Sequence, residues 1–364
     1  MHHAPARIAS LAIAPDPRGG WRFARAAGPD PARLLVGRTP QEAARLVPLV
    51  FNLCGAAHGR AAAAALGLAV DPALSAHRLA QETARDHARA ILLDWPLALG
   101  FPPDRDSLGL LARPDGAEAL IRALAGEAGD LAALSLADLA AWLAAGETGT
   151  ARLLAHLRRE VDAQEGRVAL PLLTAGALAA ALRPSPSAGV RDSGRTNGEP
   201  PHEHALAPAV PAASDRAGAD SAPADASLLY ETGALGRTAS RPLLAALLAI
   251  EGRSLFARLL ARLIDGLDAL RGTVPDTPAA PPGIGLAEAA RGLLGHGARV
   301  AEDRVAAYTV LSPSAWNLAP GGLLERAFAA LTPGPQARRL APLLISAINP
   351  CVPVTLTLGE SADA

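Results

Sequence analysis

One segment limits where this chain can build a core. Residues 184–227 are rich in proline, serine, alanine and glycine and contain almost no large apolar side chains. Such a segment buries too little apolar surface to offset the entropy that it loses on ordering, so we expect it to be disordered. The folded structure must therefore come from residues 1–183 and 228–364.

The residue types of these two parts favour helices. Alanine, leucine and arginine are abundant and lysine is absent, whereas aromatic residues make up only 3% of the chain. The first three are good helix formers, and aromatic residues are typical of strands. The exception is residues 7–28, where apolar residues alternate around a turn at 17–20 and predict a β-hairpin. We therefore expect a mainly α fold with a small N-terminal β element, in the α+β class.

Caps and prolines mark several element boundaries. Thr39, Pro40 and Glu42 form a capping-box pattern that starts a helix, which Pro48 is expected to break or kink. Further helices are predicted over residues 53–66, from 71 to a break at Pro96, in three short pieces between 116 and 164, and over 240–270. We predict a proline-rich linker over residues 275–282 and a hairpin over residues 296–311.

The charge pattern gives no reason to expect nucleic acid or a membrane as a partner. The net charge is −1, with no long run of one sign. No apolar run reaches the roughly 18–20 residues of a membrane span, and the N-terminal residues lack the apolar core of a signal peptide. Two cysteines are too few for a disulfide framework. We therefore expect a cytoplasmic protein without a membrane span.

The two cysteines have different local settings. Cys54 lies near the start of a predicted helix, where the helix terminus should lower the pKa of the thiol and favour the thiolate that binds soft metals. Cys351 lies between Pro350 and Pro353, which exclude helix. Considered alone, each cysteine is more often a small buried apolar residue than a ligand. A transient disulfide between the two is a further alternative.

Four segments, in order, resemble the large subunit of nickel–iron hydrogenases. Residues 51–62, FNLCGAAHGRAA, resemble its first metal motif, RxCGxCxxxH, and residues 230–242 resemble its E-x-G-P-L-A-R segment. Residues 349–356, NPCVPVTL, resemble its closing motif, DPCxxCxxH. The most specific match is the third block, residues 283–322, which follows the family pattern through Glu288, Arg291, Gly292, His296, Tyr308, Pro313, Trp316, Asn317 and Pro320.

The resemblance implies a pocket that has lost half of its thiol ligands. In the enzymes, the first cysteine of each motif binds nickel and the second bridges nickel and iron. Cys54 and Cys351 match the first cysteines, but Ala57 and Val354 stand at the bridging positions. Thr357 replaces the terminal histidine, and residues 7–11 lack the acidic residue of the family's N-terminal motif. A nickel–iron centre should therefore not form, which argues against a catalytic hydrogenase and implies no catalytic residues.

The outer pocket is kept. Arg291 matches the arginine that hydrogen-bonds a cyanide ligand of iron in the enzymes, although Ala290 replaces the preceding proline. Two thiolates beside this cation suit one iron that carries cyanide and carbon monoxide, without nickel. That role is proposed for large-subunit-like accessory proteins of the HupK/HoxV type.

The resemblance thus implies a maturation scaffold or carrier. Cys54 and Cys351 would bind the metal, Arg291 and His58 would contact an iron–dicyanide–carbonyl unit held transiently, and the partners would be hydrogenase maturation factors and hydrogenase subunits. The implied domain is large-subunit-like, with its first cysteine motif in residues 1–183 and its closing motif in 228–364. The alternative is a metal-free mimic of the large subunit that acts as a chaperone or interaction protein.

Other polar residues have structural interpretations. His58 follows Cys54 by four residues and shares its helix face, so it is either a second ligand or a polar residue that lines the pocket. We expect His87 to hydrogen-bond between helices, and His296 to be structural. Glu231 and Arg237 are expected to take part in a buried ion pair or cap. Trp316 and Asn317 are expected to fix the fold beneath the pocket.

Overall fold

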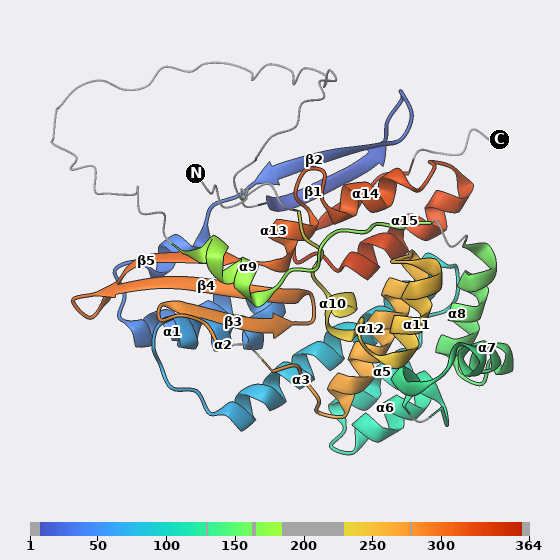
Figure 1. Ribbon diagram of the computed structural model, residues 1–364, viewed down its shortest axis with the longest axis horizontal. Coiled ribbons are helices and arrows are strands. Elements are labelled where there is room, and N and C mark those ends of the chain that lie inside the picture. The colour runs from blue at the N-terminus through green and yellow to red at the C-terminus, as the bar shows by residue number, and fades with distance from the viewer. Residues whose placement is uncertain (1–7, 129, 162–164, 184–228, 277–278, 359–364) are drawn as a thin grey trace. The chain divides into compact units, whose positions relative to one another are not determined.

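The computed structural model describes residues 8–128, 130–161, 165–183, 229–276 and 279–358, all within one compact unit (Figure 1). The disorder predicted for residues 184–227 falls outside these residues, and the predicted division of the domain stays a prediction. The described chain is mostly helical and carries two three-stranded sheets, which confirms the α+β class. None of the described helices is long and apolar enough to cross a membrane.

The first sheet joins the two ends of the described chain. β1 (Ile8–Pro15) and β2 (Trp21–Ala27) form the predicted antiparallel hairpin, and the side chains of Leu11 and Ile13 alternate into the core. The third strand, β6 (Val354–Leu356), pairs in parallel with β1. We did not predict β6, because three residues next to a proline carry no strand pattern. It begins three residues after Cys351 and anchors the closing motif to the N-terminal hairpin.

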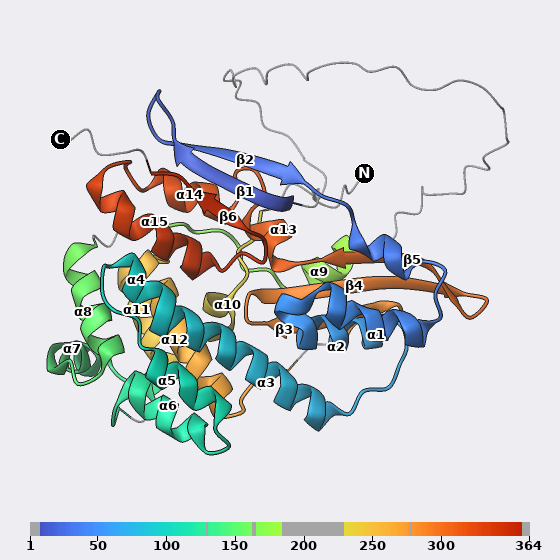
Figure 2. The same ribbon diagram turned by 180° about the vertical axis from the view of Figure 1, so that it is seen from behind.

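The second sheet contains the third block of the resemblance. β4 (Gly292–Ala301) and β5 (Arg304–Leu311) contain the predicted hairpin, whose two-residue turn has positive φ at Glu302 and Asp303. β3 (Ile284–Ala289) adds an antiparallel edge that we did not predict, because its alanines and glycine are poor strand formers. Figure 2 shows α1 and α2 on one face of this sheet.

The helices are α1 (Pro40–Val50), α2 (Gly55–Ala65), α3 (Pro72–Arg89), α4 (Trp95–Ala98), α5 (Arg105–Gly109), α6 (Gly116–Ala125), α7 (Leu136–Ala145), α8 (Gly149–Glu160), α9 (Ala175–Leu182), α10 (Ala234–Thr238), α11 (Pro242–Glu251), α12 (Leu255–Leu270), α13 (Pro313–Asn317), α14 (Leu323–Ala329) and α15 (Pro335–Ile348). The three helices predicted between residues 116 and 164 are α6, α7 and α8.

Two predicted helix boundaries were wrong. The single helix expected over residues 240–270 is two helices, because Gly252 leaves α11 with a φ of 67° and Ser254 caps α12. The chain also stays helical through Pro96, which occupies the second position of α4 after a π-helical turn at 90–94. A proline is tolerated there because the carbonyl oxygen of Leu92, four residues earlier, accepts from the amide of Asp104 at 2.8 Å and needs no donor from residue 96. In α1, Pro48 is followed by two more helical residues.

α12 lies at the centre of the main core. Almost every residue from Leu255 to Leu267 is buried, including Arg258, Arg262 and Asp265. A helix that is buried on all sides must give each charged side chain a partner, because an unpaired buried charge is strongly destabilising. Arg262 and Asp265 find their partners on α3, α10 and α15, and Arg258 finds its partner in Glu231. The charges of Arg262 and Asp265 are therefore part of the same network as the candidate site.

Gly285 lets β3 pack directly against the backbone of α2, the helix that Cys54 precedes. A Cβ at this position would lie 1.8 Å from the carbonyl oxygen of Ala61 and 2.7 Å from the amide nitrogen of Ala65. Both are backbone atoms, so the helix or the strand would have to move. This contact explains the second glycine of the G-x-G pattern.

We predict that Gly285→Ala destabilises the protein at or above the upper end of the about 1–3 kcal/mol usual for overpacking, measured as the free energy of unfolding in urea. Gly109→Ala is the control, because a Cβ at this residue at the end of α5 meets nothing within 4 Å. That variant should be neutral or gain up to about 1 kcal/mol. Equal losses in both variants would contradict the prediction.

Candidate functional site

One cavity of about 650 Å³ is lined by both cysteines. Its walls come from the end of β2, the segment before α2, the end of β5, the start of α13 and the chain after α15. Both cysteines are free thiols. The structure therefore brings Cys54 and Cys351 to one site, as the sequence predicted. The lining also includes Phe51, His58, Ser312 and Ser314.

Cys54 is almost fully buried at the N-terminus of α2, with 4% of its surface exposed. Its thiol does not cap the helix. The carboxylate of Glu82, on α3, instead accepts hydrogen bonds from the amides of Ala56 and Ala57 at 2.7 and 3.3 Å. Burial raises the pKa of Cys54 to about 12, and the charge of Arg291 opposes this only in part. The expectation of a lowered pKa was therefore wrong, because desolvation outweighs a helix terminus that Glu82 already occupies.

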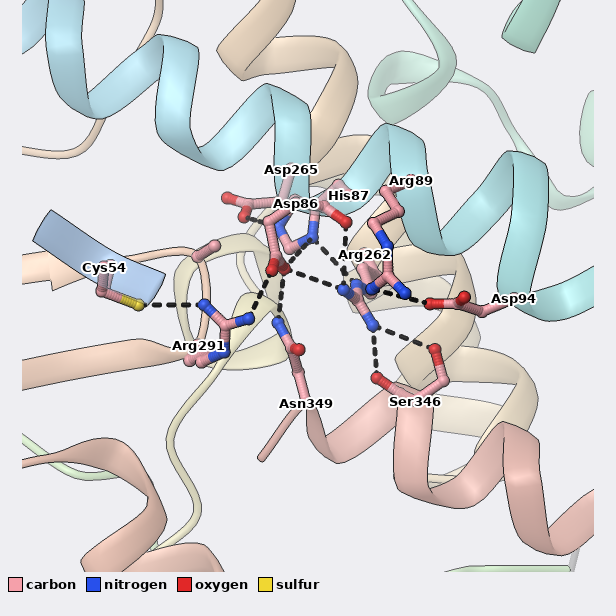
Figure 3. Close-up of polar contacts among 12 residues, drawn as sticks. Cys54, Asp86, His87, Arg89, Asp94, Arg262, Asp265, Arg291, Ser346 and Asn349 are labelled. Atoms are coloured by element: carbon pink, nitrogen blue, oxygen red, sulfur yellow. Dashed lines mark hydrogen bonds and ion pairs between the residues drawn. The ribbon is translucent and has the colours of Figure 1, made fainter. Parts of the chain in front are cut away.

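Arg291 holds a positive charge against the Cys54 sulfur. Its Nη1 donates to Sγ of Cys54 at 3.0 Å and to the carbonyl oxygen of Leu53 at 3.2 Å. Its Nη2 donates to Oδ1 of Asp86 at 2.7 Å (Figure 3). The Nε of Arg291 is buried and has no hydrogen-bond partner among the described residues. This N–H is fully enclosed and Arg291 does not line the cavity, so the contact that Arg291 offers to the site is its charge against the Cys54 sulfur.

Asp86 connects the segments of both cysteines. Besides Arg291, its carboxylate accepts from Nη2 of Arg262 at 2.8 Å and from Nδ2 of Asn349 at 2.6 Å. Asn349 ends α15 in the left-handed conformation, two residues before Cys351. Burial alone would raise the pKa of Asp86, but the two arginines outweigh it and lower the pKa to about 2. Asp86 is therefore ionised at neutral pH.

His87 extends this network between α3 and α12, as predicted. Nε of Arg262 donates to Nδ1 of His87 at 2.9 Å, so the histidine proton is on Nε2 and is donated to Asp265 at 2.7 Å. Asp265 also pairs with Arg237, which reaches Glu288 at 3.0 Å. The expectation of a buried ion pair for Arg237 is thus confirmed, with partners that the sequence did not identify.

Glu231 forms a separate buried ion pair. Its carboxylate accepts from Arg258 at 2.8 and 3.1 Å, so Glu231 and Arg237 do not pair with each other. The neighbouring Thr232 exchanges two backbone hydrogen bonds with the side chain of Asn317, at 2.7 and 3.1 Å. Asn317 therefore fixes this segment against α13, in agreement with its predicted structural role.

His58 lies on the cavity wall and His296 behind it. Nδ1 of His58 is 2.8 Å from Nε2 of His296, and Nδ1 of His296 is 2.7 Å from the hydroxyl of Tyr308. Phe51 stacks on the His58 ring with centroids 4.5 Å apart. Burial, helped by the charge of Arg291, lowers the pKa of His58 to about 3, so the ring is neutral. His296 is fully buried, as expected for a structural residue.

Cys351 is the more accessible thiol. Its backbone N–H donates to Oγ of Ser314 at 2.8 Å, and its Sγ lies 3.8 Å from Oγ of Ser312. Both serines belong to the start of α13, so Trp316 and Asn317 are on the element that supports Cys351. Within the part of the chain that the structure describes, no three His, Cys, Asp or Glu side chains gather closely enough to hold a metal ion.

Sequence reasoning missed Asp86 and Glu82. Both are acidic residues on α3, in a stretch with many charges and no motif, and their roles depend on helix packing across the chain. Each also has an arginine three or four residues away in the sequence, so a local ion pair on the helix surface was the simpler interpretation.

The fold is that of a hydrogenase large subunit. The chain superimposes on an NAD⁺-reducing [NiFe]-hydrogenase with a TM-score of 0.52, at 17% identity over 93% of this chain and 94% of that one. The Ni-Fe-Se hydrogenase of Desulfovibrio vulgaris Hildenborough gives a TM-score of 0.50, at 17% identity over 92% and 93%. The profile of the nickel-dependent hydrogenase family matches residues 215–327.

Closer relatives define the family. The hydrogenase expression/formation protein HupK of Rhodobacter capsulatus is 31% identical over 96% of this chain and 97% of its own. The hydrogenase expression/formation protein HoxV of Cupriavidus necator is 31% identical over 90% of each chain. The chain belongs to this HupK/HoxV family of hydrogenase expression/formation proteins, which confirms the resemblance seen in the sequence.

Replacing Asp86 by asparagine should destabilise the protein by about 3–5 kcal/mol, because two buried arginines lose their common counter-charge. Asp115→Asn is the control: it removes a carboxylate whose pair with Arg113 is largely exposed, and it should change stability by less than about 1 kcal/mol. The free energy of unfolding in urea at neutral pH measures both.

We also predict how the stability difference between the wild type and Asp86→Asn depends on pH. The pKa of Asp86 is lowered on folding, so its contribution is complete above the pKa of an unfolded aspartate, about 3.9, and is lost as pH falls through about 2. The stability difference between the wild type and Asp86→Asn should therefore shrink steadily below about pH 4. A difference that stays constant down to pH 2 would contradict the ion-pair assignment.

Proposed function

We propose that this protein is a maturation scaffold that transiently holds the iron–dicyanide–carbonyl unit through Cys54 and Cys351 and then passes it on. This proposal rests on the arrangement of the site: two free thiols line one cavity, and a buried guanidinium contacts one of them. The role of the family in hydrogenase expression and formation supports this proposal.

The donor set suits an iron that arrives with its own ligands. The described residues offer two thiols and no third metal-binding side chain beside them. Cyanide and carbon monoxide would complete the coordination of such an iron. Iron binding would displace the thiol protons, since a coordinating thiol is deprotonated, and Arg291 would stabilise the resulting negative charge. Arg291, which already donates to the Cys54 sulfur, would be the charged donor for a cyanide of that iron.

Nickel is not expected at this site, and neither is catalysis. Ala57, at the first bridging position, is fully buried and packs with Cys54 in an apolar cluster. Val354, at the second, is part of β6. Neither side chain has a lone pair to share between two metals. We therefore propose an accessory protein of the cytoplasm that works with hydrogenase maturation factors and hydrogenase subunits.

Infrared spectroscopy tests this function. Protein that is co-expressed with the maturation factors and purified without oxygen should show cyanide and carbonyl stretching bands. Cys54→Ala and Cys351→Ala should each abolish them, because a single thiolate cannot hold the unit in the cavity. Iron analysis of the same samples should show a parallel loss, and the wild type should contain no stoichiometric nickel.

Thr357→Ala is the matched control. Thr357 stands where the family has its terminal histidine, and its side chain is exposed. This variant should keep both kinds of band. Bands that persist unchanged in both cysteine variants would refute the thiolate scaffold.

A metal-free role is the second candidate, and the small number of metal-binding side chains at the site favours it. In that case the protein would act as a mimic of the large subunit that binds maturation factors or hydrogenase subunits as a chaperone. Complementation separates the two functions. A Cys54→Ala/Cys351→Ala double variant that still supports hydrogenase maturation would establish the metal-free role.

A further inference from the structure

His58 presents one polar atom to the cavity. The side chain is 95% buried, Phe51 covers one face of the ring, and His296 lies 2.8 Å from its Nδ1. Its Nε2 has no hydrogen-bond partner among the described residues and is not fully enclosed by them. Since His58 lines the cavity, Nε2 is the atom left for a molecule bound there. Whether Nε2 donates or accepts depends on which ring nitrogen carries the proton.

The hydroxyl of Tyr308 decides the direction of the chain. Tyr308 is buried, and the described residues offer its hydroxyl one partner, Nδ1 of His296 at 2.7 Å. Burial raises the pKa of Tyr308, so the hydroxyl keeps its proton. If it donates this proton, Nδ1 of His296 is the acceptor and the His296 proton is on Nε2. That proton is then donated to Nδ1 of His58, whose own proton must be on Nε2.

The opposite direction is less stable. There, His58 would donate to His296 and His296 to the Tyr308 oxygen. The Tyr308 proton would then have no acceptor among the described residues, at a penalty of about 1–3 kcal/mol for a buried unpaired donor. A doubly protonated ring is excluded at neutral pH, because burial lowers the pKa of both histidines. Each direction leaves one proton without an acceptor in the described chain. In the first it is the Nε2 proton of His58, which lines the cavity and can be satisfied there, whereas in the second it is the hydroxyl proton of Tyr308, which is buried and does not line the cavity.

We propose that Tyr308 and His296 fix His58 as a neutral imidazole with its proton on Nε2, so that His58 donates a hydrogen bond to a cyanide nitrogen of the iron unit. This inference rests on the proposed function and deepens it. Cyanide nitrogen is a far better acceptor than carbonyl oxygen. Arg291 would serve one cyanide as a charged donor and His58 the other as a neutral donor.

The fixed proton also has a second effect. An imidazole binds a metal through a nitrogen lone pair. With Nδ1 accepting from His296 and Nε2 protonated, His58 has no free lone pair for iron. The side chain that could have been a third ligand therefore contacts the ligands of the iron and not the iron itself. The iron remains bound to the protein by two thiolates, which suits later release.

The position of the proton can be measured without any iron unit. In protein labelled with ¹⁵N-histidine, nitrogen NMR should show His58 and His296 as neutral rings protonated on Nε2, with signals assigned from His58→Gln and His296→Gln. Tyr308→Phe removes the donor at the start of the chain, and the proton on the two rings should then distribute over both nitrogens. His87, whose proton is fixed by Arg262, should not change and is the internal control. A wild-type His58 protonated on Nδ1 would overturn the inference.

Infrared spectra of the loaded protein test the contact. His58→Phe keeps an aromatic ring beside Phe51 and removes the N–H, so one cyanide band should shift while the carbonyl band moves less. His58→Gln restores an N–H donor and should return that band toward its wild-type position. Tyr308→Phe should shift the same band by a smaller amount. Cyanide bands unmoved in all three variants would overturn the inference and leave the scaffold function standing. Loss of all bands from the wild type would refute the scaffold function, and with it the cyanide contact.

Discussion

The site depends on one buried carboxylate. Asp86 accepts hydrogen bonds from Arg291, Arg262 and Asn349 at 2.6–2.8 Å, and each donor belongs to a different part of the chain. Arg291 contacts the first cysteine, Asn349 precedes the second, and Arg262 belongs to the central helix α12. A buried ion pair is weak evidence for stability in itself, because the desolvation of its charges offsets much of their attraction. Its value here is geometric, because a three-way contact has few alternative arrangements. The positions of both thiols therefore depend on the same carboxylate as the core.

The cavity places a buried, protonated thiol beside a fixed positive charge. Burial raises the pKa of the Cys54 thiol to about 12, which opposes formation of the thiolate in the absence of metal. The charge of Arg291 lowers the pKa of this thiol and would stabilise the negative charge on the sulfur once the proton has left. The neutral pair of His58 and His296 adds polarity without adding charge. The charged groups of the site are thus paired within the protein, and an anionic occupant beside Cys54 would gain a further attraction from Arg291.

Local sequence patterns predicted the first hairpin and most helices. Tertiary contacts determined a helix boundary and two strands that those patterns missed. The hairpin at residues 8–27 and the helices with caps or prolines at their starts followed from short-range signals that the structure retains. The split at Gly252 was missed because an apolar run of good helix formers continues on both sides of it. β3 and β6 were missed because their strand character comes from pairing and not from their residues. In the site, Cys54, Cys351, His58 and Arg291 were found through motifs. Asp86 and Glu82 were not, because nothing near them in the sequence shows that α3 packs against α2 and α12.

The pairing of β6 with β1 has a consequence for the synthesis of this protein. Cys351 and β6 follow almost all other described elements along the chain, whereas β1 is the first of them. While the chain emerges from the ribosome, the hairpin β1–β2 has one open edge, and the wall of the cavity that carries Cys351 does not yet exist. The strand that completes the sheet also brings the second thiol into position. The two-thiol cavity and the three-stranded sheet are therefore completed by the same segment, and neither exists before Leu356 has been synthesised.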